Sequence, residues 1–239
     1  MKAIILCAGL GSRLNSSKPK GFIVIKKKSL LERCVNNLIS VGLKKKDIFF
    51  ATGFKKNLVE KKFGKKFNYS FNKYYKVTNM VYTLFNTLKN INDSDVIITY
   101  SDIIYDKENL KRLLNKKEDI STLVDFKWKK IWIKKNKLLS DSESLKIKKN
   151  KIIELGKPTK DIKKIDGRYV GVIKISKNIL PKIKNLYWKS MTQNSKKFKK
   201  IDMTNFLNFL IKKRYDINYA KLTGNWNEYD DFVDLNFKI

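Results

Sequence analysis

The first stretch able to do chemistry is a glycine-bearing loop at Leu6–Leu14, with the sequence LCAGLGSRL. Gly9 and Gly11 let backbone amides approach a ligand closely, because they carry no side chain. Arg13 in the loop and Lys20 shortly after it add positive charge. Amides and cations in this order can cradle a triphosphate by neutralising its negative charge. The loop therefore predicts a site for nucleotide phosphates.

The spacing of this loop excludes two better-known glycine loops. A dinucleotide-binding loop would carry a third glycine where this chain has Leu14, and a Walker loop would contain a Gly-Lys-Ser/Thr run that is missing here. The remaining pattern, Gly-x-Gly-x-Arg followed by Pro19-Lys20, is more specific than two glycines alone. The alternative explanation is a tight turn with surface cations.

Carboxylates form the second candidate group. The run Val96–Tyr100 (VIITY) has the pattern of a buried strand and stops at Ser101-Asp102, and the carboxyl end of a central strand is a usual place for a site. Asp230 follows near the end of the chain. Mg²⁺ is held by one or two carboxylates together with substrate phosphates and water, which Asp102 and Asp230 could supply. The alternatives are a turn or cap carboxylate for Asp102 and a solvated helix start for Asp230.

Composition sets limits on this chemistry. Histidine is absent from the 239 residues, which excludes imidazole acid–base catalysis and His metal sites. Cys7 and Cys34 fall inside an expected strand and an expected helix, where thiols are usually buried, so a disulfide framework is not expected. Catalysis must therefore use carboxylates, Lys, Arg, hydroxyls and backbone.

The net charge of +32 favours a different class of function, a basic nucleic-acid-binding protein. Two observations weaken that alternative. The lysines are spread over the whole chain rather than gathered in one arm, and the arginines that usually read bases and phosphates are few: Arg13, Arg33, Arg112, Arg168 and Arg214. We expect no nucleic-acid partner, and a positive field that attracts nucleotides.

The elements that must position these residues follow from periodicity. Strand Lys2–Cys7, helix Leu30–Val41 and strand Ile48–Thr52 form a βαβ start, which predicts parallel strands covered by helices. Further strands are expected at Phe67–Phe71, Val96–Tyr100, Ile120–Phe126, Val170–Ile175 and Ile217–Leu222, and helices at Asn79–Leu88, Asn109–Leu114 and Ile201–Ile211. Short β segments are expected across Trp128–Glu154, giving a mixed or antiparallel second half.

Length and hydropathy predict one domain over residues 1–239, with a nucleotide-binding half at about 1–125 and an acceptor-binding half at about 126–239. The apolar start lacks the length and cleavage site of a signal peptide, and no stretch approaches ~20 apolar residues. We expect a soluble cytoplasmic protein. The sequence does not indicate an oligomeric state.

The chain resembles the small CTP-dependent nucleotidyltransferases, namely phosphocholine cytidylyltransferase and the related enzymes of phosphonate and capsule-phosphoramidate pathways. The glycine loop carries the resemblance first. Thr78–Tyr82 is similar to the family segment in which an Asn begins a helix, and Trp226–Asp230 to the family's W-x-E-x-D. Ser101 stands where many relatives have Gly. The segments 139–143, 153–157 and 167–171 resemble parts of the family that line the acceptor side.

The resemblance implies a Rossmann-like, GT-A-like α/β fold of three layers with a mixed, mostly parallel sheet. It implies nucleotide-binding roles for Leu6, Ala8, Gly9, Gly11, Ser12, Arg13, Lys20 and Asn79. It implies acceptor-binding roles for Glu154, Lys157 and Glu228, and Mg²⁺ ligands at Asp102 and Asp230. Arg13, Lys20, Asp102 and Asp230 are the expected catalytic residues.

The implied reaction transfers CMP from CTP to a small phosphorylated or phosphonate acceptor and releases pyrophosphate. Phosphocholine, 2-aminoethylphosphonate and phosphoglutamine remain open as acceptors. An acceptor phosphate is already ionised near pH 7, so the absence of His is no obstacle. A sugar-1-phosphate nucleotidyltransferase using UTP or dTTP is the alternative within enzymes.

Overall fold

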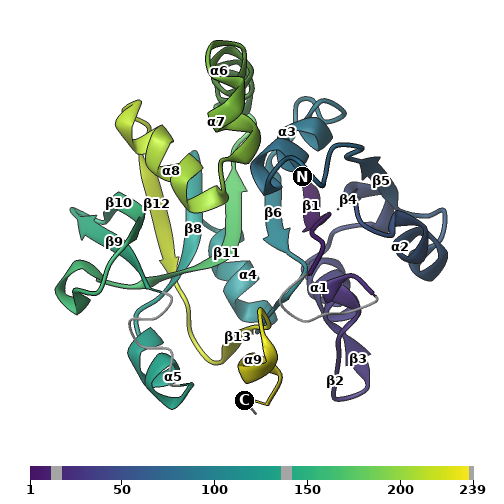
Figure 1. Cartoon of the computed structure of the whole chain (residues 1–239), viewed down its shortest axis with the longest axis horizontal. Coiled ribbons are helices and arrows are strands. Elements are labelled where there is room, and N and C mark those ends of the chain that lie inside the picture. The colour runs from purple at the N-terminus through teal and green to yellow at the C-terminus, as the bar shows by residue number, and fades with distance from the viewer. Residues whose placement is uncertain (12–17, 136–141, 237–239) are drawn as a thin grey trace.

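The computed structural model describes residues 1–11, 18–135 and 142–236 (Figure 1). A nine-stranded sheet in the order β5-β4-β1-β6-β11-β8-β12-β10-β9 runs through the molecule. Its strands are β1 (Lys2–Cys7), β4 (Ile48–Thr52), β5 (Asn68–Phe71), β6 (Val96–Tyr100), β8 (Ile120–Asp125), β9 (Glu143–Lys148), β10 (Lys151–Pro158), β11 (Arg168–Ile175) and β12 (Ile217–Lys221).

Strand directions make the sheet mixed. β5, β4, β1 and β6 are parallel neighbours, as the βαβ start requires. β11 lies antiparallel between β6 and β8, and β10 lies antiparallel between β12 and β9. The predicted mixed, mostly parallel sheet is therefore confirmed.

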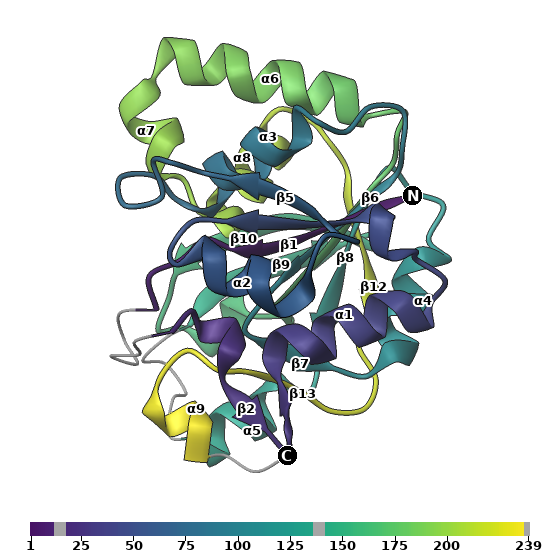
Figure 2. The same ribbon diagram turned by 90° about the vertical axis from the view of Figure 1, so that its right-hand side faces the viewer.

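Helices cover both faces of the sheet (Figure 2). One face packs against α3 (Met80–Leu88), α6 (Leu180–Gln193), α7 (Ser195–Lys200) and α8 (Met203–Lys212). The other face packs against α1 (Leu30–Ser40), α2 (Lys56–Phe63), α4 (Lys107–Leu114) and α5 (Trp128–Lys134). The short elements are β2 (Val24–Ile25), β3 (Lys28–Ser29), β7 (Ile103–Tyr105), β13 (Trp226–Glu228), α9 (Phe232–Asn236) and the 3-10 turns η2 (Lys20–Phe22), η3 (Lys45–Asp47) and η4 (Ile162–Lys164).

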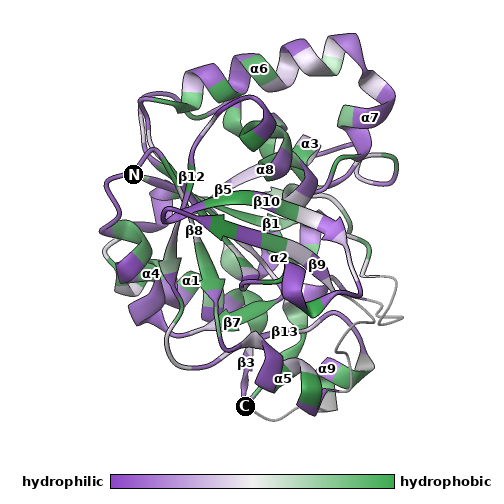
Figure 3. Cartoon of the chain, turned by 90° about the vertical axis from the view of Figure 1, so that its left-hand side faces the viewer, coloured by the Kyte–Doolittle hydropathy of each residue, from purple (hydrophilic) through white to green (hydrophobic). Residues whose placement is uncertain are grey.

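The alternation of side chains along β1 explains the three layers. Ile4 and Leu6 pack with one set of helices, whereas Ala3, Ile5 and Cys7 pack with the other. A strand covered on both faces must be apolar throughout, and Figure 3 shows hydrophobic colour along the strands of the sheet. The expected three-layer α/β architecture is confirmed.

One expected element is wrong. Trp128–Lys134 is helix α5 rather than a β segment. Trp128 and Trp132 stand four residues apart and are both buried, the spacing of one helix face, and Trp132 stacks on Trp226 with ring centroids 5.8 Å apart. The short run of alternating apolar residues hid this helical spacing.

Helices α2, α6 and α7 were not predicted from the sequence. For α6 a signal exists, because Leu180, Ile183, Tyr187 and Met191 are buried at helical spacing. Among the helices of the described ranges, none is long and apolar enough to cross a membrane.

Candidate active site

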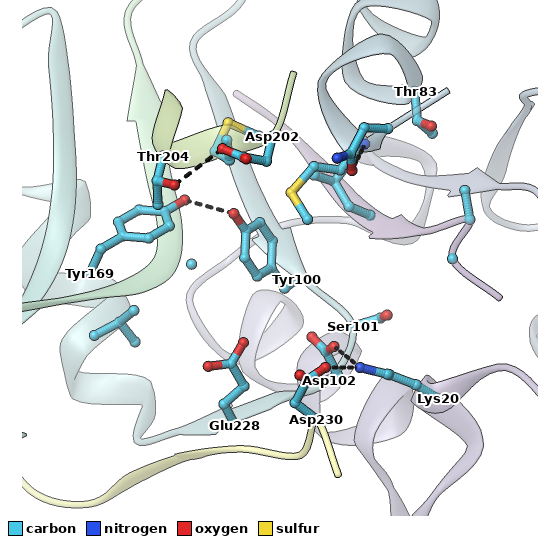
Figure 4. Close-up of a pocket in the computed structure, with 18 of the residues that line it drawn as sticks. Lys20, Thr83, Tyr100, Ser101, Asp102, Tyr169, Asp202, Thr204, Glu228 and Asp230 are labelled. Atoms are coloured by element: carbon cyan, nitrogen blue, oxygen red, sulfur yellow. Dashed lines mark hydrogen bonds and ion pairs between the residues drawn. The ribbon is translucent and has the colours of Figure 1, made fainter. Parts of the chain in front are cut away.

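A cavity of about 540 Å³ lies where β1 and β6 end (Figure 4). Leu6 pairs with Tyr100 in the parallel register, so the loop after β1 and the turn after β6 meet at this edge. The predicted nucleotide-binding residues that line the cavity are Leu6, Ala8, Gly9, Gly11, Lys20 and Asn79. Ser12 and Arg13 lie outside the described residues.

The glycine loop is shaped for close approach. Gly11 has φ +64°, a left-handed conformation that favours glycine, and a Cβ there would lie 3.0 Å from Cγ of Lys20. A side chain at Gly11 would thus press on the lysine at the start of η2. Glycine at this position therefore lets the loop approach Lys20 closely at the cavity wall.

Lys20, Asp102 and Asp230 converge in this cavity (Figure 4). The Nζ of Lys20 contacts Oδ1 of Asp230 and lies 3.6 Å from Oδ2 of Asp102. The side chains are 17–22% exposed, so solvent reaches them only in part.

The pairing of β7 with β13 brings the two aspartates together. Glu228 is in register with Ile103, and the backbone N–H of Tyr229 donates to the carbonyl of Asp102 at 2.9 Å. Asp230 therefore follows directly beside the turn that carries Asp102. Residues far apart in the chain become neighbours through this short antiparallel pair.

Burial raises the pKa of Asp102 above its ordinary value, and the charge of Lys20 opposes this rise. A second cation beside this carboxylate would stabilise its charged form further. The oxygens of Asp102 and Asp230 already face one ammonium, which marks a position for positive charge between them. Hard oxygen ligands of this kind fit Mg²⁺, provided that substrate phosphates complete the coordination. Among the described residues, no cluster of three or more metal-binding side chains occurs.

Asn79 lies at the cavity as the N-cap of α3. Its Oδ1 accepts from the N–H of Met80 at 2.7 Å, and its Nδ2 donates to the carbonyl of Lys200 at 3.1 Å. The side chain thus fixes the start of α3 against the end of α7. A direct contact with nucleotide stays a prediction.

The cavity continues toward the second half of the chain, where Glu228 points into it (Figure 4). Oε2 of Glu228 lies 3.9 Å from Nη2 of Arg168, and the guanidinium carbon of Arg168 lies 3.8 Å from the ring centroid of Trp132. The hydroxyls of Tyr100 and Tyr169 are hydrogen bonded at 3.3 Å across the same space. Gly171, with φ +84°, leaves room for Tyr100, whose Cδ2 would lie 2.6 Å from a Cβ there.

The structure does not bring Glu154 and Lys157 into this cavity. They form an ion pair with each other on β10, and neither lines the cavity, whereas Leu155 between them does. The hydrogen bond from Lys157 lowers the pKa of Glu154. Their acceptor-binding role stays a prediction, without support from their position.

Sequence reasoning missed several residues of the cavity wall. The sequence places Arg168 among the few arginines and in a segment of family resemblance, without a predicted role of its own. It predicts no role for the other wall residues Tyr100, Tyr169, Asp202 and Thr204. Asp202 begins α8, where its carboxylate accepts from the N–H of Asn205 at 2.8 Å. Only the packing of α8 on β10 brings it to the cavity, and no local signal in the sequence reports that packing.

Comparison with known proteins agrees with this geometry. Residues 3–153 match the MobA-like NTP transferase domain family. The chain is 34% identical to the CTP:phosphoglutamine cytidylyltransferase of Campylobacter jejuni over 254 aligned residues, covering 100% of this chain and 99% of that enzyme.

Solved structures show the same fold. The inositol-1-phosphate CTP transferase from T. maritima has a TM-score of 0.76 at 18% identity, covering 98% of this chain and 91% of that one. The CTP:phosphocholine cytidylyltransferase from Streptococcus pneumoniae has a TM-score of 0.70 at 20% identity, covering 98% and 96%. The chain belongs to the MobA-like NTP transferases and, through its full-length relative, to the small CTP-dependent nucleotidyltransferases.

Proposed function

We propose that this protein transfers CMP from CTP to a small phosphorylated acceptor in a Mg²⁺-dependent reaction, and that the acceptor is an amide phosphate of the phosphoglutamine type. The observation that carries the reaction is the convergence of Lys20, Asp102 and Asp230 beside the glycine loop in one cavity. The acceptor class comes from the full-length relative in Campylobacter jejuni, which is a CTP:phosphoglutamine cytidylyltransferase.

The reaction needs positioning more than proton transfer. An ionised oxygen of the acceptor phosphate attacks the α-phosphorus of CTP, the new O–P bond forms, and the bond to the β-phosphate oxygen breaks to release pyrophosphate. Because the attacking oxygen is already ionised, no general base is required. A chain without histidine can therefore perform this chemistry.

The residues at the cavity have distinct tasks in this proposal. Gly9 and Gly11 give the phosphates access to backbone amides, and Lys20 neutralises charge that develops on pyrophosphate. Asp102 and Asp230 would hold Mg²⁺, which when bound neutralises phosphate charge. Glu228 and Arg168 lie on the acceptor side of the same space.

A pyrophosphate-release screen tests the proposal. ATP, GTP, CTP and UTP, with dTTP added, are each combined with phosphoglutamine, phosphocholine, 2-aminoethylphosphonate and glucose-1-phosphate. We expect turnover with CTP and phosphoglutamine. Turnover confined to UTP or dTTP with the sugar phosphate would replace this function by that of a sugar-nucleotide enzyme.

A further inference from the structure

The charge of the cavity is opposite to that of the molecule. The chain has a net charge of +32, yet the charged residues described at the cavity wall are mostly acidic. The carboxylates are Asp102, Glu143, Asp202, Glu228 and Asp230, whereas the described cations are Lys20 and Arg168. Asp102 and Asp230 are assigned to Mg²⁺ in the proposed function, and Glu143 and Asp202 accept hydrogen bonds from Thr204. Because CTP and an acceptor phosphate bring only negative charge, the further carboxylate of Glu228 suits a ligand that also carries a positive group.

Two of these charged side chains have opposite charges, form an ion pair and are not among the proposed metal ligands. Arg168 and Glu228 lie 3.9 Å apart, with side chains 17% and 31% exposed. The guanidinium carbon of Arg168 lies 3.8 Å from the ring centroid of Trp132, a cation–π contact that holds the guanidinium against the aromatic face. A planar fork held in this way suits a carboxylate, which it binds through two parallel hydrogen bonds.

We propose that Arg168 and Glu228 recognise the amino-acid head of the acceptor, with Arg168 binding its α-carboxylate and Glu228 its α-ammonium. This inference rests on the proposed function, because it takes the amide phosphate of an amino acid as the acceptor. It adds the residues that read the head group, and it predicts that acceptors lacking either charge are poor substrates.

The spacing of the carboxylates agrees with such an acceptor. Glu228 and Asp230 are two residues apart on one segment, and both point into the cavity (Figure 4). In an extended chain this separation is about 7 Å. A ligand with its phosphate near Asp230 and its ammonium near Glu228 must therefore be elongated. In phosphoglutamine the amide and the side-chain methylenes supply that length between the phosphate and the charged head.

Phosphocholine fits this arrangement less well. Its quaternary ammonium could lie near Glu228, but it has no carboxylate for Arg168. Its binding would therefore give the guanidinium no ligand carboxylate beside the ion pair with Glu228. A site made to bind a charged group rejects analogues that lack it, because its own polar groups then lose their partner.

The alternative is a purely structural ion pair, in which Arg168 serves to anchor Trp132 and β13. The two explanations predict different kinetics. A structural role lowers stability and affects all acceptors alike. A recognition role affects only the acceptors that carry the matching charge.

The test compares three acceptors in wild type and variants: phosphoglutamine, its analogue without the α-carboxylate, and its analogue without the α-amino group. We expect Arg168→Gln to reduce kcat/KM for phosphoglutamine on the order of 100-fold. The same variant should leave kcat/KM for the analogue without the carboxylate nearly unchanged. Arg168→Lys keeps the charge but loses the guanidinium fork, so its kcat/KM for phosphoglutamine should lie between the values for wild type and Arg168→Gln. Arg112→Gln, the same change at an exposed position of α4, is the matched control and should behave as wild type.

Glu228→Gln provides the complementary arm and keeps the Arg168 side chain that lies over Trp132. This variant should lower kcat/KM for phosphoglutamine and leave kcat/KM for the analogue without the amino group nearly unchanged. If Arg168→Gln fails to fold, this second variant alone decides the inference. Melting temperature and CTP binding are recorded for every variant to separate folding from recognition.

The outcomes distinguish the two proposals. Equal losses for all three acceptors in Arg168→Gln and in Glu228→Gln would overturn the recognition of the head group and leave the proposed function standing. Wild-type turnover of phosphocholine without turnover of phosphoglutamine would overturn the proposed acceptor together with this inference.

Discussion

Nζ of Lys135 lies 2.8 Å from Oδ1 of Asp234, in an ion pair whose side chains are only 1% and 3% exposed. The other oxygen of Asp234 accepts the backbone N–H groups of Asp230 and Asp231, at 2.8 and 3.2 Å. Lys135 also donates to the side-chain oxygen of Asn227 on β13. The pair therefore fixes the backbone on both sides of Glu228 and Asp230, although neither partner lines the cavity.

Because this pair positions Asp230, its loss should weaken metal binding without removing a ligand. We expect Lys135→Met and Asp234→Asn to raise the Kd for Mn²⁺, measured by electron paramagnetic resonance, by about 10-fold. Activity at saturating metal should recover in part. Both variants should also melt at lower temperature, because each leaves a buried charge or polar group without its partner.

Lys151→Met is the matched control for that experiment. Lys151 pairs with Asp216 at 2.6 Å, but these side chains are 46% and 63% exposed and lie away from the cavity. An exposed pair contributes little. Unchanged Mn²⁺ affinity in Lys135→Met, with the melting temperature lowered, would reduce the buried pair to a structural role.

Asp102 and Asp230 are predicted to act on one ion. Asp102→Asn and Asp230→Asn keep the size and one oxygen but remove the charge, so each should reduce turnover by at least about 100-fold. EDTA should abolish activity of the wild type, and excess Mg²⁺ or Mn²⁺ should rescue the variants only in part. Coupled pyrophosphate release measures all of these. Full activity in Asp102→Asn, or turnover in EDTA, would refute the two-carboxylate mechanism.

Lys20 is predicted to neutralise negative charge on the nucleotide phosphates. Lys20→Ala should lower kcat by about 100-fold, because its ammonium would no longer stabilise the departing pyrophosphate. The fold should persist, since Lys20 lies in a short turn at the cavity rather than in the sheet. Circular dichroism and single-turnover rates with CTP test this together. A wild-type rate in the variant would remove Lys20 from the catalytic residues.

Glu32 gives a prediction for stability against pH. Hydrogen bonds from Ser29 lower the pKa of Glu32 to about 2, in the capping box at the start of α1. Because the folded-state pKa lies below the ordinary value of 4.5, its stabilisation is present above about pH 4.5 and is lost as the pH falls toward 2. At pH 7, Glu32→Gln should lower Tm by roughly 1–3 °C.

The difference in Tm between wild type and Glu32→Gln should shrink as the pH is lowered below about 4.5. Differential scanning calorimetry from pH 7 downward measures it. Glu108→Gln, in the first turn of α4 where Glu108 pairs with Lys111, is a surface control. A difference that grows on acidification would contradict the assigned sign.

The local sequence pattern was sufficient to predict an element where its apolar residues recur with the period of a buried strand or helix. The strand at Lys2–Cys7, the helix after it and the strand before Asp102 were predicted close to their observed bounds, because apolar runs and helical spacing act within one segment. The same reasoning failed at Trp128–Lys134, where a short apolar run fits both periods. Tertiary burial of Trp128 and Trp132 decided in favour of a helix.

By itself, the sequence determined the glycine loop, the carboxylates that can bind a hard ion and the absence of histidine chemistry, since residue type and spacing fix these. Only the tertiary structure decided which of them meet. The pairing of β13 with β7 brings Asp230 beside Asp102, and Lys20 contacts Asp230 although 210 positions separate the two residues. Lys157 on β10 lies outside the cavity, whereas Arg168 on β11 lines it. Contacts between distant segments depend on strand order and helix packing, which no local pattern encodes.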